Sequence, residues 1–204
     1  MSVIVPCIRE AEEITKCEIL PIRQQLWGSR YPVRAYGRMA LIPEKEWIVE
    51  LTAEEPNPMR RYYNSNDPVY LDSALEVFLN FQPEDSRNRY MNLEANSNGA
   101  LLSEFGIKGS RRYLSDIAGE WPVCCETKLE QERWSVCFRI PLELIQELYS
   151  AEVMKAGGDF TFALYKISET SEIEHYISYS DIPVEKPDFH LPQYFARGRV
   201  NFEL

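Results

Sequence analysis

The stretch DPVYLDSALEVFLNF, residues 67–81, decides the fold of this chain. From Ala74 to Phe81 the residues are mostly apolar and favour β-structure, and Glu76 interrupts them. A carboxylate inside an apolar strand costs several kcal/mol unless it is hydrogen-bonded or faces a wet cleft. The stretch therefore predicts a buried strand whose Glu76 side chain has a partner or lines a cleft.

A second polar pattern follows the turn QPED, residues 82–85. In the run YMNLEAN, residues 90–96, the side chains of Asn92, Glu94 and Asn96 stand at alternate positions. Alternate side chains of a strand share one face, so these three form a polar stripe next to Glu76. The stripe fits either the wall of a binding site or the solvated face of an edge strand.

Short apolar runs separated by turn signals make up most of the remaining chain. We expect strands over residues 33–42, 47–52, 74–81, 90–96, 100–105, 123–130, 133–140, 159–167, 174–180 and 199–202. The Asn98-Gly99 pair is a tight-turn signal between two of them. This pattern predicts an all-β fold, an antiparallel β-sandwich with immunoglobulin-like layering.

One or two short helices complete the predicted fold. Pro141 begins a helical pattern that runs to about Val153 and places its large apolar side chains on one face. A second helical piece is expected over residues 111–117. The chain length suits a single domain over residues 1–204, with residues 1–26 as an N-terminal extension or an edge strand.

Composition narrows the classes of partner. The net charge of −10 disfavours nucleic acid, anionic membrane surfaces and polyanionic glycans. No window is apolar enough to span a membrane, and the N-terminus shows no signal peptide. The five cysteines are an odd number without regular spacing, which favours a reducing compartment. We expect a cytoplasmic protein, or an extracellular one if a leader was removed.

The stretches around Glu76 also carry a family resemblance. DPVYLDSALEVFLNF followed by YMNLEANSNG resembles the central block of the family 9 type of carbohydrate-binding module, a DOMON-like β-sandwich that holds sugars at an aromatic-lined site. HYISYSDIP, residues 175–183, and PDFHLPQYF, residues 187–195, resemble that family's serine-aromatic-serine strand and its closing loop. The resemblance spans roughly Trp27 to the C-terminus and is strongest in these blocks.

The resemblance implies a sugar site between aromatic rings. Tyr70 and Phe189 match the positions of the family's platform aromatics, where strong sugar binders carry tryptophan, and Glu76 matches an acidic hydroxyl acceptor. Sugar sites combine flat rings with placed polar groups, which fits this set. The expected ligand-binding residues are Tyr70, Glu76, Asn92, Glu94, Tyr165, Phe189 and His190.

Plainer readings of the same residues stay open. Glu76 also fits a structural carboxylate that accepts a hydrogen bond from a loop amide. Tyr70 and Phe189 also fit ordinary core aromatics. We expect the arginine pairs at residues 60–61 and 111–112 to face solvent.

No cofactor is expected. A metal site would need the two histidines to converge with cysteines or acids, and Cys124 and Cys125 are adjacent rather than spaced as in zinc motifs. A structural calcium ion cannot be placed because acidic residues are too abundant. Haem bound by Met91 and His190 is disfavoured, since Met91 points to the face opposite Asn92.

The predicted function is non-catalytic binding of a neutral oligosaccharide or glycan chain end. No nucleophile elbow, phosphate loop or metalloprotease helix is present. Two alternatives remain: a protein-interaction scaffold, and a glycoside hydrolase or accessory domain that uses two of the many carboxylates.

Overall fold

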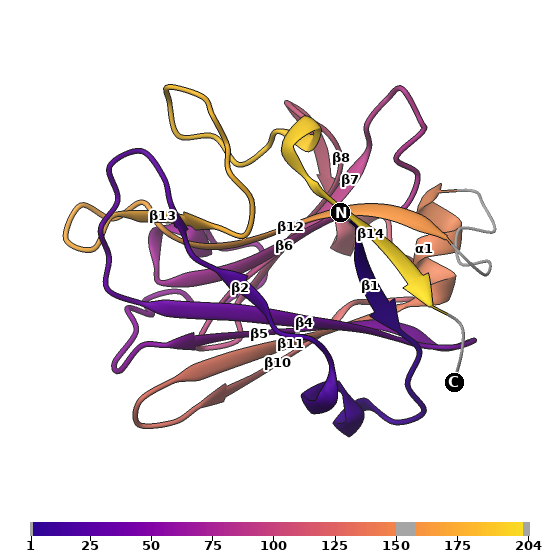
Figure 1. Cartoon of the computed structure of the whole chain (residues 1–204), viewed down its shortest axis with the longest axis horizontal. Coiled ribbons are helices and arrows are strands. Elements are labelled where there is room, and N and C mark those ends of the chain that lie inside the picture. Colours follow the sequence, from indigo (N-terminus) through magenta and orange to yellow (C-terminus); the bar gives the residue numbers. More distant parts are fainter. Residues whose placement is uncertain (1, 150–157, 202–204) are drawn as a thin grey trace.

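Two β-sheets lie face to face and form the two layers of the molecule (Figure 1). The computed structural model describes residues 2–149 and 158–201. Its strands are β1 Val3–Pro6, β2 Leu20–Ile22, β3 Gln24–Gln25, β4 Arg34–Ile42, β5 Glu46–Glu54, β6 Ala74–Asn80, β7 Tyr90–Asn96, β8 Leu101–Ile107, β9 Ser110–Tyr113, β10 Cys124–Leu129, β11 Trp134–Pro141, β12 Asp159–Ser168, β13 His175–Ser178 and β14 Ala196–Asn201. The helices are α1 Leu142–Tyr149 and the 3-10 turns η1 Ala11–Lys16, η2 Val69–Leu71, η3 Leu114–Asp116 and η4 Pro192–Tyr194.

The larger sheet has nine strands and contains the stretch that decides the fold. Its order is β1-β14-β12-β6-β7-β8-β9, and β13 also pairs with β12 and joins β3 to the sheet. All its pairs are antiparallel except β1 with β14. The strand β7 therefore lies between β6 and β8, so its polar stripe is not the solvated face of an edge strand.

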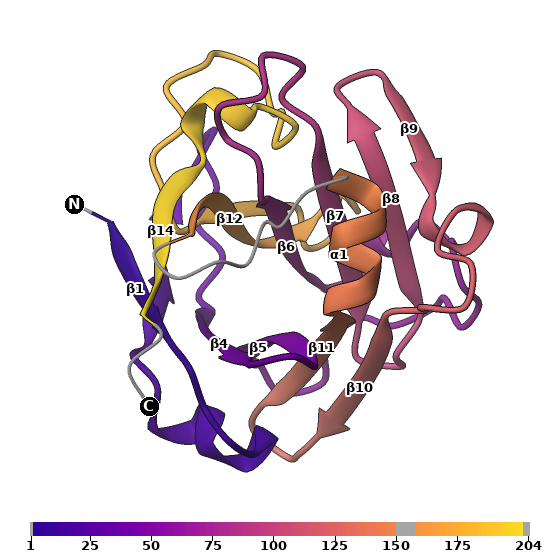
Figure 2. The same cartoon turned by 90° about the vertical axis from the view of Figure 1, so that its right-hand side faces the viewer.

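The smaller sheet has five strands in the order β10-β11-β5-β4-β2, all antiparallel. Figure 2 shows this sheet below the larger one, with α1 beside the gap between the layers. The main core fills the space between the two sheets. Leu75, Val77 and Leu79 of β6 face Trp47 and Val49 of β5 within it, and all five are fully buried.

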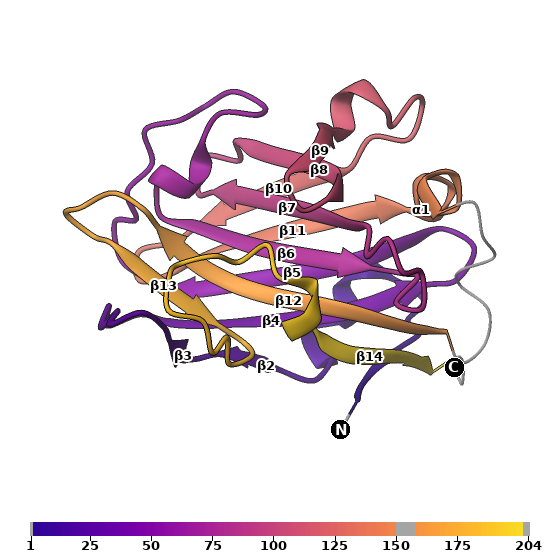
Figure 3. The same cartoon turned by 90° about the horizontal axis from the view of Figure 1, so that it is seen from above.

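The alternation of β6 explains why a second apolar cluster exists. Residues on its other face point away from the core, yet Phe78 there is also fully buried. The segment that joins β13 to β14 arches over this outer face of the larger sheet (Figure 3). Its side chains Ile182, Phe189 and Phe195 pack with Phe78 and cover part of the face. The uncovered part is where the pocket described below lies.

The predicted all-β sandwich is confirmed, and the turn at Gly99 is present with φ of 83°. The expectation of a helix over residues 111–117 is wrong for its first half, because residues 110–113 pair with β8 as strand β9. The predicted helix after Pro141 is α1, and the part expected beyond residue 149 lies outside the described residues. Within the described residues, no helix has both the length and the apolar character needed to span a membrane.

Candidate functional site

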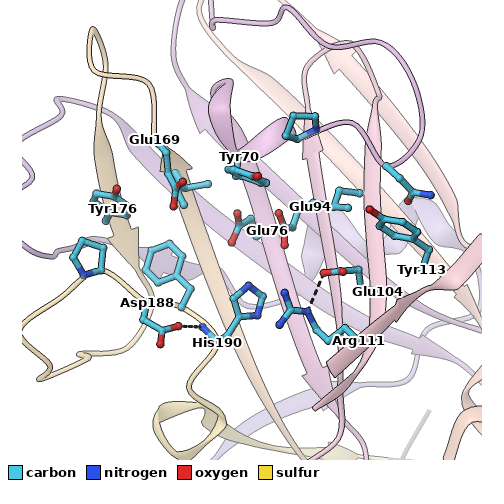
Figure 4. A pocket seen from close by; sticks show the side chains of 16 residues that line it. Tyr70, Glu76, Glu94, Glu104, Arg111, Tyr113, Glu169, Tyr176, Asp188 and His190 are labelled. Carbon is cyan, nitrogen blue, oxygen red and sulfur yellow. Dashed lines mark hydrogen bonds and ion pairs between the residues drawn. The ribbon is translucent and has the colours of Figure 1, made fainter. Parts of the chain in front are cut away.

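A pocket of about 600 Å³ opens on the outer face of the larger sheet (Figure 4). Strands β6 to β9 supply one side of it, η2 and the end of β12 supply another, and the segment 187–190 supplies a third. The volume lies in the usual range for small-ligand sites. The pocket thus joins parts of the chain that are far apart in sequence.

The floor of the pocket is a pair of carboxyl groups. Glu76 of β6 and Glu94 of β7 are direct partners in the antiparallel register, and both are almost fully buried. Figure 4 shows the two side chains next to each other, with Tyr70 beside them. Burial, and then the neighbouring charge of Glu94, raises the pKa of Glu76 well above its usual range, and burial raises the pKa of Glu94 to about 8.

A short polar chain holds Glu94 and the neighbouring wall. The Asn92 amide donates to Glu94 Oε1 at 2.9 Å and to Glu104 Oε2 at 3.2 Å. Glu104 in turn accepts from Arg111 Nε at 2.9 Å. Register places Asn92 opposite Glu104, which explains why one amide reaches both carboxylates. Asn92 is fully buried, and its hydrogen bonds hold the Glu94 and Glu104 side chains that line the pocket.

The aromatic rings at the pocket differ in their exposure. Tyr70 lies in η2 and is half-buried, and its carbonyl accepts from the backbone N–H of Glu169 at 2.8 Å. Tyr113 at the end of β9 is 42% exposed and forms part of the rim. Tyr176 of β13 is 9% exposed. Tyr70 and Tyr113 are therefore the rings with surface available to a ligand.

Phe189 contributes to the pocket in another way than the sequence suggested. Its ring stacks on the Tyr165 ring with centroids 3.8 Å apart and planes 3° apart, and the Tyr165 hydroxyl donates to the Phe189 carbonyl at 3.2 Å. Trp27 lies 5.5 Å away on another side. Only 5% of Phe189 is exposed, so it anchors the closing segment and presents little ring face to the pocket.

His190 is held at the pocket wall in its neutral form. Its Nδ1 shares a hydrogen bond with the Tyr90 hydroxyl at 2.9 Å, and its backbone N–H donates to Asp188 Oδ1 at 2.9 Å. Burial, and then the charge of Arg111, lowers the pKa of His190 to about 4. A neutral imidazole can offer a ligand one donor or one acceptor.

Two buried networks fix the elements around the floor. Asp72, which follows η2, accepts from the backbone N–H groups of Arg61 and Tyr62 and from the Asn96 amide, at 2.8 to 3.0 Å. The hydrogen bond to Asp72 gives Asn96, the third residue of the polar stripe, a structural role. The bonds tie the loop before β6 to β7, and Tyr70 is positioned by the same turn.

The second network lies on the core side of the sheet. The Lys166 ammonium contacts the Ser73 hydroxyl, His175 Nε2 at 2.8 Å and Glu55 Oε2 at 3.4 Å. Lys166 follows Tyr165 in β12, so the two side chains point to opposite faces of the sheet. The Lys166 ammonium is thus paired with groups inside the sandwich, near the start of β6.

The structure brings together five of the seven residues named from the sequence. Tyr70, Glu76, Glu94, Phe189 and His190 line the pocket. Asn92 and Tyr165 do not reach its surface, because Asn92 lies behind Glu94 and Glu104 and Tyr165 lies beneath Phe189. We expected both as ligand contacts, and the structure corrects this to supporting roles.

Seven polar or aromatic lining residues were missed. They are Asn66, Glu104, Arg111, Tyr113, Glu169, Tyr176 and Asp188. Arg111 was expected to face solvent, but it faces Glu104 because residues 110–113 form a strand. Alternation in β8 would have placed Glu104 on the face of Asn92 and Glu94 once their register was known.

The described residues contain no group of three or more histidine, cysteine or acidic side chains placed to hold a metal ion. Met91 belongs to the core between the sheets, whereas His190 lies at the outer pocket, so the two do not converge on a haem.

The fold places the chain among the β-sandwich proteins, with a pocket on the outer face of the larger sheet. The family model of carbohydrate-binding family 9 matches residues 7–202, so the chain belongs to that family and carbohydrate binding is its function. A comparison with curated proteins returned no match.

Solved structures agree with the fold. A Bacteroides uniformis ATCC 8492 protein assigned to carbohydrate binding is similar with a TM-score of 0.78 and 22% identity, over 98% of this chain and 97% of that chain. A family 9 module of Caldicellulosiruptor kristjanssonii in complex with cellotriose has a TM-score of 0.67 and 12% identity, over 100% and 95%. A family 9 module of Caldicellulosiruptor kristjanssonii in complex with glucose has a TM-score of 0.68 and 13% identity, over 100% of this chain and 97% of that chain.

Proposed function

We propose that the pocket floored by Glu76 and Glu94 binds a saccharide without acidic groups, a neutral oligosaccharide or a glycan chain end, and performs no chemistry on it. Family membership supports the ligand class. Similar modules have been solved with glucose and with cellotriose, which are neutral sugars. The pocket's excess of acidic side chains disfavours uronates and sulfated sugars.

One observation carries the proposal: a half-buried ring, Tyr70, borders a pocket whose floor is two carboxyl groups. Pyranose rings present C–H faces that pack on aromatic rings and hydroxyl rims that need hydrogen-bond partners. Tyr70 offers the first kind of contact. Glu76 and Glu94 offer the second, with His190 as a further polar group at the wall.

The placement of the two carboxyl groups favours binding over hydrolysis. In glycosidases the two catalytic carboxyl groups flank the scissile bond from opposite sides. Glu76 and Glu94 instead sit next to each other on one sheet face and form a common floor. A sugar above them would meet both acids from the same side, which suits recognition of its hydroxyl groups.

Thermal unfolding with added sugar tests the proposal. We expect the melting temperature to rise with the concentration of glucose or cellotriose, since a ligand at a hundred times its Kd adds about 2.7 kcal/mol of stability. Tyr70→Ala removes the platform and abolishes the rise. Tyr63→Ala is the matched control, because Tyr63 is 73% exposed and does not line the pocket.

The result that would overturn the proposal is the absence of any rise across a broad panel of neutral glycans. A rise that Tyr70→Ala leaves unchanged would place the sugar elsewhere. Release of chromophore from aryl glycosides, lost in Glu76→Gln, would assign hydrolysis to the same floor.

A further inference from the structure

The charges around the pocket are unbalanced. Its acidic lining residues are Glu76, Glu94, Glu104, Glu169 and Asp188. Arg111 is the one basic residue among the described side chains that line it, and its guanidinium is engaged by Glu104 at 2.9 Å. Asp188 pairs with Lys108. Among the described lining residues, the acidic groups without a cation in contact are therefore the floor pair and Glu169.

Glu76 has no hydrogen-bond partner among the described residues, although only 2% of it is exposed. The two acids next to it on the sheet have partners: Glu94 accepts from Asn92, and Glu104 accepts from Asn92 and Arg111. Buried polar groups in folded proteins almost always have partners. The unpartnered carboxyl group lines the pocket, so a ligand is the partner that the fold leaves room for.

A ligand group that binds Glu76 also lies next to Glu94, because the two residues are directly opposed in the sheet. Directly opposed side chains in an antiparallel pair have Cβ atoms about 4.5–5.5 Å apart, and like charges there repel. The Lys166 ammonium does not relieve this repulsion by contact, because it is bonded to Ser73, His175 and Glu55 on the core side of the sheet. A group with positive charge and several N–H donors stabilises the ionised form of both carboxyl groups and donates to both at once.

We propose that the preferred ligand of this pocket is an amino sugar with a free, protonated amino group, which lies over the floor and donates to Glu76 and Glu94. This inference rests on the proposed function. Neutral sugars bind the same site through their hydroxyl groups, which donate to the carboxyl groups but bring no positive charge. Acetylation of the amine removes the charge and adds bulk, so the N-acetylated sugar loses the advantage.

Calorimetric titration near neutral pH with glucosamine, N-acetylglucosamine, glucose and glucuronate tests the inference. We expect glucosamine to bind with a Kd at least about tenfold lower than that of N-acetylglucosamine. The reason is that a hydrogen bond to a charged group is stronger than a neutral one by an energy that corresponds to about this ratio of Kd values. Glucose binds more weakly than glucosamine, and glucuronate gives no heat of binding.

Glu76→Gln identifies the cause of the preference. The variant keeps the size of the side chain and removes its charge, so it binds glucosamine no more tightly than glucose. An unchanged circular dichroism spectrum and a cooperative urea transition show that the variant is folded. Glu172→Gln is the matched control, because it removes one exposed carboxylate that does not line the pocket and leaves the preference intact.

The results distinguish the preference for an amino sugar from saccharide binding itself. If glucose binds as tightly as glucosamine, or if the preference survives in Glu76→Gln, the inference fails and saccharide binding stands. If neither glucosamine, glucose nor cellotriose binds, both fail together.

Discussion

The ring of Phe189 lies flat on the ring of Tyr165, with 3.8 Å between centroids, and this stack fixes the segment that closes the pocket. Tyr165 belongs to β12 in the sheet, whereas Phe189 belongs to the segment between β13 and β14. The contact therefore ties a long connection to a rigid strand, and it sets where His190 and Asp188 stand.

Truncation of this stack should loosen the closing segment. We expect Phe189→Ala to lower the free energy of unfolding by about 3 kcal/mol, because a buried ring is lost, and to weaken sugar binding through displacement of His190. Tyr165→Phe keeps the ring and loses only the hydrogen bond to the Phe189 carbonyl, so its loss is about 1 kcal/mol. Urea unfolding of both variants measures the difference, and equal losses would contradict the anchoring role of the stack.

The floor pair makes stability depend on pH. Because burial raises the pKa of Glu94 to about 8, the folded state binds more protons than the unfolded state between the ordinary carboxyl pKa and pH 8. The free energy of unfolding therefore falls as pH rises through this window. Glu94→Gln removes this contribution, so the variant loses less stability than the wild type between pH 5 and pH 9.

Urea unfolding at the two ends of that window measures the effect, with Glu132→Gln on the exposed β10–β11 turn as the control. We expect the control to follow the wild type, and the floor variant to gain at least about 1 kcal/mol relative to it at the alkaline end. An unchanged pH dependence in Glu94→Gln would show that its carboxyl group ionises without penalty in the folded state.

The buried ion pair on the core side is expected to stabilise the start of β6. Lys166→Met leaves the buried Glu55 carboxylate without its cation, which typically costs about 3–5 kcal/mol. Adding Glu55→Gln removes the unpaired buried charge, so the double variant regains part of the lost free energy of unfolding. Chemical unfolding of the three proteins tests this, and a double variant less stable than Lys166→Met would contradict it.

Tyr113 at the rim is expected to contact a second sugar unit. Its ring is 42% exposed and stands on β9, away from the closing segment. Tyr113→Ala should weaken cellotriose binding several-fold and leave glucose binding nearly unchanged, because only the longer ligand reaches the rim. Calorimetry with both sugars measures this, and an equal loss for both would place Tyr113 at the primary sugar position instead.

Sequence patterns identified the strands and the floor of the pocket for a physical reason. Alternation puts Glu94 on one face of β7 with the polar stripe, and the register that pairs Glu76 with Glu94 brings the two side chains together. The pattern could not reveal β9, since SRRY has no apolar alternation and is a strand only through its pairing with β8. Arg111 was missed for that reason.

The roles of the aromatic residues were harder to predict. A sequence does not distinguish a ring with a free face, such as Tyr70, from a ring that stacks on another side chain, such as Phe189. The exposed face of Tyr70 and the covered faces of Phe189 follow from the path of the segment 179–195 over the sheet.

A crystal structure of the protein grown with glucose tests the central claim most directly. The account predicts one pyranose ring packed beside Tyr70, with its polar groups within hydrogen-bond distance of Glu76 and Glu94. A sugar bound on another surface, with this pocket containing only water at saturating glucose, would contradict it.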